Sequence, residues 1–302
     1  MQQLQTPPGA RIAGIWLPLI TPFADGVLDA AALPALVRYY LDAAIDGLIL
    51  AATTGEGMTL DDQETQRLVS VAAEAAAGQV PVFLGLSGSD TRRLVARLAA
   101  TRGWPIAGYL VACPYYTRPS QSGLLRHFSE LAANTSHPIM VYNIPYRTGV
   151  NLANDTLLAL AELDAIVGVK DCCADPRQSF ALIRQRPPGF AVMTGEDTQF
   201  YSAISQGADG GILASAHVAP DAFVALHRAW RARETDAALT QWSDLVELVY
   251  LMFAEPSPAP IKHWLWCQGL LRSPELRLPM TGVSDALAAA IAREAAQRTN
   301  RQ

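Results

Sequence analysis

The sequence predicts an α/β protein, a closed (β/α)8 TIM barrel that is followed by additional C-terminal helices. Short, continuous apolar segments alternate with longer amphipathic segments over residues 12–232, and eight such pairs follow one another. This alternation is typical of a parallel sheet covered by helices, and eight repeats close a barrel. The alternative is an open doubly wound sheet, which is disfavoured because no GxGxxG motif follows an early strand.

The apolar segments are predicted to be buried strands, because they are short, unbroken and bounded by glycine, proline or threonine. The polar residues that act on a ligand in this fold come at the carboxyl end of each strand or in the loop after it. The predicted strands comprise residues 12–20, 47–52, 81–86, 107–113, 138–143, 165–170, 190–195 and 209–214.

Each predicted strand is followed by a segment with helical character, such as residues 29–44 and 61–77. In the second of these, Asp61 and Glu64 have the spacing of a capping box. We therefore expect the barrel, with a short N-terminal arm, to occupy residues 1–232. The rest of the chain, 233–302, is predicted to be a helical extension that serves either as an appendage or as an oligomer surface.

Composition excludes several classes of protein. The chain has 302 residues, of which 50% are hydrophobic and 17% charged, so a large core is expected and disorder is not. The net charge is −5 with no basic cluster, which argues against a nucleic-acid partner. The N-terminus lacks the pattern of a signal peptide, and no apolar stretch reaches the roughly 20 residues of a membrane helix. The four cysteines and five histidines lack metal-ligand spacing, so we expect a cytoplasmic, metal-free protein without a cofactor.

Lys170 is the most informative strand-end residue. It ends the segment AIVGVK, so its side chain is expected to lie in or just above the barrel. Burial there lowers the pKa of the ammonium group and frees the neutral amine to form an imine with a ketone or aldehyde. The alternative is a structural lysine that is paired with a carboxylate, either Glu56 or Asp171.

Other strand ends offer groups that suit such chemistry. Tyr142, one strand away from Lys170, can move protons during imine formation, or it is simply a core tyrosine. The turn with Thr53 and Thr54 offers hydroxyls and backbone N–H groups to a carboxylate, or it is an ordinary strand-to-loop turn. Arg147 can bind a substrate carboxylate through two hydrogen bonds, or it forms a surface ion pair.

Six segments stand out in order along nearly the whole chain. They are TTGE at 53–56, PYYTRPS at 114–120, YNIPYRTG at 142–149, GVKD at 168–171, TGED at 194–197 and EPSPAPIK at 255–262. Together they resemble the dihydrodipicolinate synthase and N-acetylneuraminate lyase superfamily. The resemblance is strongest to the dihydrodipicolinate synthase branch, also called 4-hydroxy-tetrahydrodipicolinate synthase.

This resemblance implies a role for each matching residue. Lys170 would form the Schiff base with pyruvate, and Tyr142 would be the proton donor and acceptor. Thr53 would link Tyr142 to Tyr116, which in this family reaches in from the neighbouring subunit and completes a proton relay. The family is metal-free and is usually a homotetramer built as a dimer of tight dimers.

The remaining implied roles concern substrate binding. Thr54 and the backbone near Ile212 would hold the pyruvate carboxylate, and Arg147 would bind the carboxylate of L-aspartate 4-semialdehyde. The implied activity is that of a class I lyase of lysine biosynthesis, which makes 4-hydroxy-tetrahydrodipicolinate from these two small molecules. Feedback by lysine is not expected, because Arg93 falls where regulated members have a glutamate.

The chain departs from the family pattern close to the expected pocket. Asp-Cys-Cys follows Lys170 where small residues are common, Leu213 and His217 differ in the last strand, and Tyr146 replaces a smaller residue. These changes keep a second hypothesis open, a 2-keto-3-deoxy sugar-acid aldolase or dehydratase of the same superfamily. A third hypothesis, from another class, is a non-catalytic binding protein on the same barrel.

Overall fold

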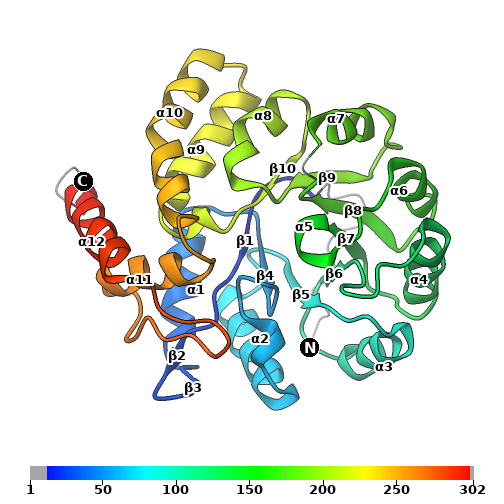
Figure 1. Ribbon diagram of the computed structural model, residues 1–302, viewed down its shortest axis with the longest axis horizontal. Helices are drawn as coiled ribbons and strands as arrows, with labels where there is room; N and C mark the ends of the chain where they lie inside the picture. Colours follow the sequence, from blue (N-terminus) through cyan, green and yellow to red (C-terminus); the bar gives the residue numbers. More distant parts are fainter. Residues whose placement is uncertain (1–11, 174, 300–302) are drawn as a thin grey trace.

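A closed barrel of eight parallel strands forms the centre of the molecule (Figure 1). The structure, a computed structural model, describes residues 12–173 and 175–299. Each predicted apolar segment matches one barrel strand to within two residues at either end, so the predicted fold class is confirmed. Around the barrel the strands are β1 (Gly14–Pro18), β4 (Gly47–Leu50), β5 (Val82–Leu86), β6 (Gly108–Ala112), β7 (Ile139–Asn143), β8 (Ile166–Asp171), β9 (Ala191–Thr194) and β10 (Gly210–Ile212), which pairs with β1.

Helices surround the barrel on the outside, and the capping box predicted at Asp61 and Glu64 is present at the start of α2. The outer helices are α1 (Leu33–Asp42), α2 (Asp62–Ala76), α3 (Thr91–Thr101), α4 (Gln121–Ala133), α6 (Asn154–Leu160), α7 (Pro176–Gln185), α8 (Phe200–Ser205) and α9 (Pro220–Arg231). Short elements lie in the loops: the hairpin β2 (Phe23–Ala24) and β3 (Val27–Leu28), and the single turns η1 (Gly57–Thr59), α5 (Pro145–Thr148), η2 (Asp197–Gln199) and η3 (Ser215–His217).

Three further helices follow α9 and lie together on one side of the barrel (Figure 1). They are α10 (Thr235–Met252), α11 (Ala259–Cys267) and α12 (Asp285–Thr299). α10 packs along α9, and α11 contacts both α12 and η3. The division of the chain between 232 and 233 stays a prediction. Among the described residues, none of the helices combines the length and the apolar character that a membrane span requires.

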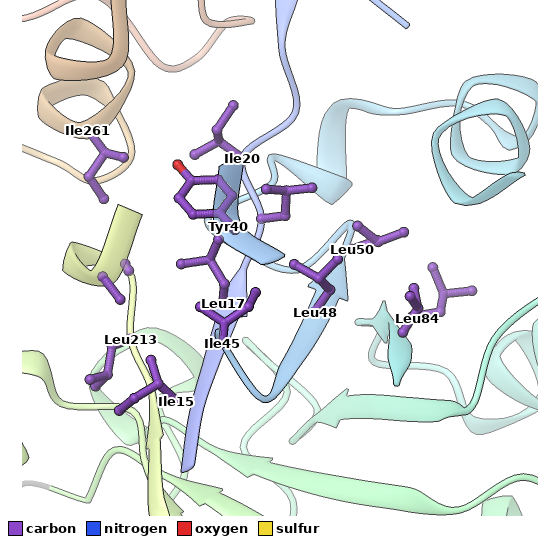
Figure 2. Packing of buried hydrophobic residues seen from close by; sticks show 14 of the residues in the cluster. Ile15, Leu17, Ile20, Tyr40, Ile45, Leu48, Leu50, Leu84, Leu213 and Ile261 are labelled. Carbon is purple, nitrogen blue, oxygen red and sulfur yellow. The ribbon is translucent and has the colours of Figure 1, made fainter. Parts of the chain in front are cut away.

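The apolar side chains of the barrel strands belong to two packed layers. An outer layer lies between the strands and the helices, and Figure 2 shows part of it, including Leu17 of β1 and Ile261 of α11. A second layer fills the barrel and includes Trp16, Met140 and Ile212. Side chains of a strand point alternately to the two layers.

The alternation brings Lys170 to the inside of the barrel. Val169 belongs to the outer layer, so its neighbour Lys170 points inward. The pairing of β7 with β8 skips Val167, because Ile139 pairs with Ile166 and the next residue pairs with Gly168. This irregularity sets the register that places Tyr142 opposite Lys170.

Candidate active site

The amine of Lys170 lies inside the barrel against the phenol ring of Tyr142. Its Nζ is 4.4 Å from the centroid of that ring, and only 5% of the residue is exposed. Burial is the largest influence on this group and lowers the pKa of the ammonium, while the Arg147 guanidinium lowers it further. Cys172, Asp197 and Glu196 act in the opposite direction but do not outweigh the burial. A lysine in this setting supplies the neutral amine that attack on a carbonyl requires.

The alternative of an ion-paired Lys170 is wrong. In the described chain no carboxylate oxygen lies within salt-bridge distance of its Nζ. Glu56 pairs instead with Lys262, and Asp171 accepts hydrogen bonds from the Ser179 hydroxyl at 2.5 Å and the Cys173 N–H at 3.0 Å. The chain contains only two lysines. Lys262 is ion-paired with Glu56, whereas Lys170 is not ion-paired in the described chain.

Gly195 makes room for the lysine side chain. It follows β9, and its N–H donates to the Asp171 carbonyl at 2.9 Å. A Cβ atom at this position would lie 2.5 Å from Cys172 Sγ and 2.9 Å from Lys170 Cγ, with Lys170 Cε closer still. Only a residue without a side chain allows the lysine stem and the thiol to pack against this part of the chain.

Tyr142 presents a buried hydroxyl to the same space. Burial raises the pKa of this phenol well above its ordinary value, so the group keeps its proton near neutral pH. The Cys172 thiol lies 3.9 Å from the hydroxyl oxygen. Burial also raises the pKa of that thiol well above its ordinary value, so Cys172 is a neutral neighbour of the two groups. Cys172 was noted in the sequence only as a departure from the family pattern, and its place beside Tyr142 was not predicted.

The Thr53–Thr54 turn follows β4 at the mouth of the barrel. Ala51 and Glu56, which flank it, have left-handed φ values of 53° and 52°. The Glu56 N–H closes the turn by donating to the Thr53 carbonyl at 3.1 Å. Thr53 is half-buried and Thr54 is buried, and within the described residues neither hydroxyl has a hydrogen-bond partner. Of the two, only Thr53 lines the cavity at this end of the barrel.

A cavity of about 800 Å³ opens at this end of the barrel. Thr53, Tyr142 and Arg147 line it, so the structure brings these three predicted site residues together. Ser87, Asp90 and Arg93 also line it. A space of this size is typical of sites for small molecules.

Four predicted site residues, Lys170, Thr54, Tyr116 and Ile212, do not line this cavity, although Lys170 lies against Tyr142, which does. Tyr116 is 92% exposed, has a φ of 70°, and is held by its N–H, which donates to the Thr148 carbonyl at 3.1 Å. Within one chain it does not line the cavity, where Tyr115 is found instead. Ile212 is fully buried in the inner layer of the barrel on β10.

Two carboxylates after β9 were missed by the sequence reasoning as members of the site. Asp197 is buried and accepts hydrogen bonds from the N–H and the hydroxyl of Ser215, at 2.6 and 2.5 Å, and burial raises its pKa to about 6. Glu196 has one buried carboxylate oxygen without a partner in the described chain. It contributes to raising the pKa values of both Cys172 and Tyr146, so it lies close to both. The only signal for these residues was the matching segment at 194–197.

No group of three or more histidine, cysteine, aspartate or glutamate side chains could hold a metal ion in the part of the chain that the structure describes. All four cysteines are free thiols.

Comparison with known proteins agrees with this geometry. The family model described as "Dihydrodipicolinate synthetase family" matches residues 11–297. The chain is 41% identical over 277 residues to 4-hydroxy-tetrahydrodipicolinate synthase 2 of Clostridium acetobutylicum, which covers 92% of this chain and 97% of that relative. Dihydrodipicolinate synthase from Aquifex aeolicus superposes with a TM-score of 0.91 at 32% identity, covering 96% and 98% of the two chains. A chloride-inhibited dihydrodipicolinate synthase from Acinetobacter baumannii, solved in complex with pyruvate, superposes with a TM-score of 0.91 at 30% identity, covering 96% and 99%.

Proposed function

Because this chain belongs to the dihydrodipicolinate synthetase family, we propose that it condenses pyruvate with L-aspartate 4-semialdehyde to give 4-hydroxy-tetrahydrodipicolinate. It is a class I, Schiff-base-forming lyase, and this reaction serves lysine biosynthesis. The observation that carries the proposal is the buried amine of Lys170, which has no ion-pair partner in the described chain and lies against Tyr142. The relative solved with pyruvate supports the choice of the first substrate.

The chemistry begins at Lys170. Its neutral amine adds to the C2 carbonyl of pyruvate, and loss of one water molecule gives the imine. Loss of a proton from the methyl group converts the imine to an enamine, whose carbon adds to the aldehyde carbon of the second substrate. Tyr142, which burial keeps protonated, donates a proton to the departing hydroxyl and later to the new alkoxide. Attack of the substrate's own amino group on the imine carbon then releases Lys170 as the free amine and closes the product ring.

The polar groups around the cavity have roles that fit this sequence of steps. Thr54 and the backbone near Ile212 hold the pyruvate carboxylate. Thr53, which lines the cavity with Tyr142, passes protons between Tyr142 and Tyr116 of a second subunit. The high exposure of Tyr116 in a single chain supports this assignment, because its phenol projects away from its own cavity.

The assembly and the location are part of the same proposal. A relay that is completed by a second chain requires at least a tight dimer, and we propose a homotetramer made of two such dimers. The four free thiols fit a reducing compartment, and we place the protein in the cytoplasm. The absence of lysine feedback stays a prediction from Arg93.

Arg147, which lines the cavity, binds the carboxylate of the semialdehyde.

A second candidate function is a 2-keto-3-deoxy sugar-acid aldolase or dehydratase on the same imine platform. The two departures from the family pattern at Cys172 and Tyr146 favour it, because both residues lie beside the Glu196 carboxylate and change the polar surroundings of the amine. A coupled assay of pyruvate with aspartate semialdehyde, run beside cleavage of sugar-derived keto acids, separates the two.

Reductive trapping tests the platform itself. Borohydride reduction in the presence of pyruvate should add one reduced pyruvate to Lys170, and peptide mapping distinguishes this lysine from Lys262, the only other lysine in the chain. Lys170→Ala should abolish the adduct and lower turnover by several orders of magnitude while the barrel stays folded. Tyr116→Phe should slow turnover while the oligomer stays intact. A wild-type protein that binds pyruvate but forms no adduct would instead be a non-catalytic binding protein.

A further inference from the structure

The second lysine of the chain lies in a buried ion pair that joins the C-terminal helices to the mouth of the barrel. Lys262 on α11 is fully buried, and its Nζ pairs with the Glu56 carboxylate, whose side chain is also buried. The same Nζ donates to the carbonyl of Glu275 at 2.8 Å. Lys262 and Glu56 are 206 positions apart in the sequence. The pair therefore connects segments that share no local structure.

Arg277 adds a second connection to the same carboxylate. The backbone N–H of Arg277 donates to the other carboxylate oxygen of Glu56 at 3.0 Å. The Arg277 guanidinium donates to the Thr59 carbonyl at 3.0 Å and to the carboxylate of Glu64 on α2. The ring of Phe23 contacts both cations, with Lys262 Nζ and Arg277 Cζ each 4.3 Å from its centroid. Both oxygens of Glu56 are thus held by the segment that follows α10.

Glu56 flanks the Thr53–Thr54 turn and closes it through its N–H, and the backbone at this turn is strained. Ala51 and Glu56 are both left-handed, a conformation that is unfavourable for residues other than glycine and persists only where the surroundings fix it. On the other side of the turn, the Thr21 hydroxyl donates to the Gly55 carbonyl at 2.6 Å. The turn is therefore fixed at two points, by Thr21 and by the pair of Glu56 with Lys262.

A buried ion pair contributes little to stability compared with apolar side chains of similar volume, so stability alone is a weak explanation for this one. A carboxylate held at both oxygens does fix the position of the backbone that carries it. We propose that Lys262 and Glu56 are positioning residues for the pyruvate site, through which the C-terminal helices hold the Thr53–Thr54 turn in its binding geometry. This inference rests on the proposed function. It gives the C-terminal helices a role beyond that of an appendage or an oligomer surface.

Steady-state kinetics of Lys262→Met and of the double variant Glu56→Gln/Lys262→Met test the proposal. The KM for pyruvate should rise about tenfold in both variants, while the KM for the second substrate stays within about twofold of wild type. The double variant removes both charges, so its melting temperature should recover toward the wild-type value while its KM for pyruvate stays raised. A purely structural role predicts the opposite, namely a lower folded fraction with an unchanged KM. Arg272→Met is the matched control, because it removes another cation of the same segment whose partner, Asp25, is exposed.

A neutral variant keeps the test decisive if Lys262→Met does not fold. Thr21→Val removes the hydrogen bond to Gly55 without leaving a buried charge, and it should raise the KM for pyruvate several-fold. A KM for pyruvate within about twofold of wild type in the folded double variant or in Thr21→Val would overturn the positioning role. Wild-type protein is trapped with borohydride in parallel. Failure of the wild type to form the adduct counts against the proposed function, whereas a normal wild type with normal variants counts against the positioning role alone.

Discussion

Replacement of Gly195 by alanine tests whether Lys170 depends on the narrow space that the structure leaves for it. The added methyl group would enter a region already filled by the lysine stem and by the Cys172 thiol, 2.9 Å from Lys170 Cγ and 2.5 Å from Cys172 Sγ. Ordinary contact between such atoms needs about 3.5–4.0 Å, so the lysine or the backbone after β9 must move by roughly 1 Å.

Two consequences follow from that displacement. Overpacking of a filled interior costs about 1–3 kcal/mol of unfolding free energy. A reacting group displaced by roughly 1 Å loses about 100-fold in rate. Gly195→Ala should therefore lower kcat/KM far more than its loss of stability explains, and the rate of borohydride trapping with pyruvate should fall in parallel.

Urea unfolding and trapping kinetics are measured on the same preparations. Gly103→Ala is the control, since a Cβ there has no neighbour within 4 Å, and it should stay within about 0.5 kcal/mol of wild type with normal trapping. Adding Cys172→Ala to Gly195→Ala removes the nearest sulfur atom and should restore part of the stability. A Gly195→Ala protein that traps pyruvate at the wild-type rate would refute the placement of the amine.

Other predictions concern charge and pH. Arg147 lowers the pKa of Lys170, and Asp197 raises it. In a plot of trapping rate against pH, Arg147→Gln should therefore move the rising limb to higher pH, and Asp197→Asn should move it to lower pH. Shifts of both variants in the same direction would contradict this account. The His217 ring accepts a hydrogen bond from the Ile20 N–H at 3.1 Å, and burial lowers its pKa from 6.5 to about 4. As the pH falls below about 6.5, His217 becomes protonated in the unfolded chain but not yet in the folded protein. The free energy of unfolding is therefore unaffected by this titration above pH 6.5, and it falls by about 3 kcal/mol as the pH drops toward 4. The difference in unfolding free energy between wild type and His217→Gln should shrink over that range, and a constant difference would show that His217 is not the group responsible.

The barrel was predictable because its signal is local. Each strand is a short apolar run, and the capping box at Asp61 and Glu64 is contained in four residues. The hairpin of β2 and β3 was missed, since two-residue strands carry no periodicity. The first predicted helix, 29–44, begins too early, because α1 starts only at Leu33, with Pro34 in its first turn.

The site was predictable only in part. The neighbourhood of Lys170 and Tyr142 follows from strand order, and the register confirms it. A local sequence pattern does not give the distance between residues on different strands of the barrel. For this reason the sequence did not identify the neighbours of the amine, which are Cys172, Glu196 and Asp197. The same limit explains the wrong partner suggested for Lys170, since the cation that binds Glu56 comes from a helix more than 200 positions away.

The two lysines of this chain show that burial alone does not determine whether an amine is protonated. Both are withdrawn from water, and burial lowers the pKa of each. Lys262 has the Glu56 carboxylate in contact, which favours its charged form and makes it a structural cation. Lys170 has a phenol ring, a thiol and a glycine backbone around it, and its carboxylate neighbours lie beyond salt-bridge distance. The pairing of Glu56 with Lys262 therefore has a second effect, because it satisfies the carboxylate nearest the threonine turn and leaves Lys170 as the amine that can lose its proton.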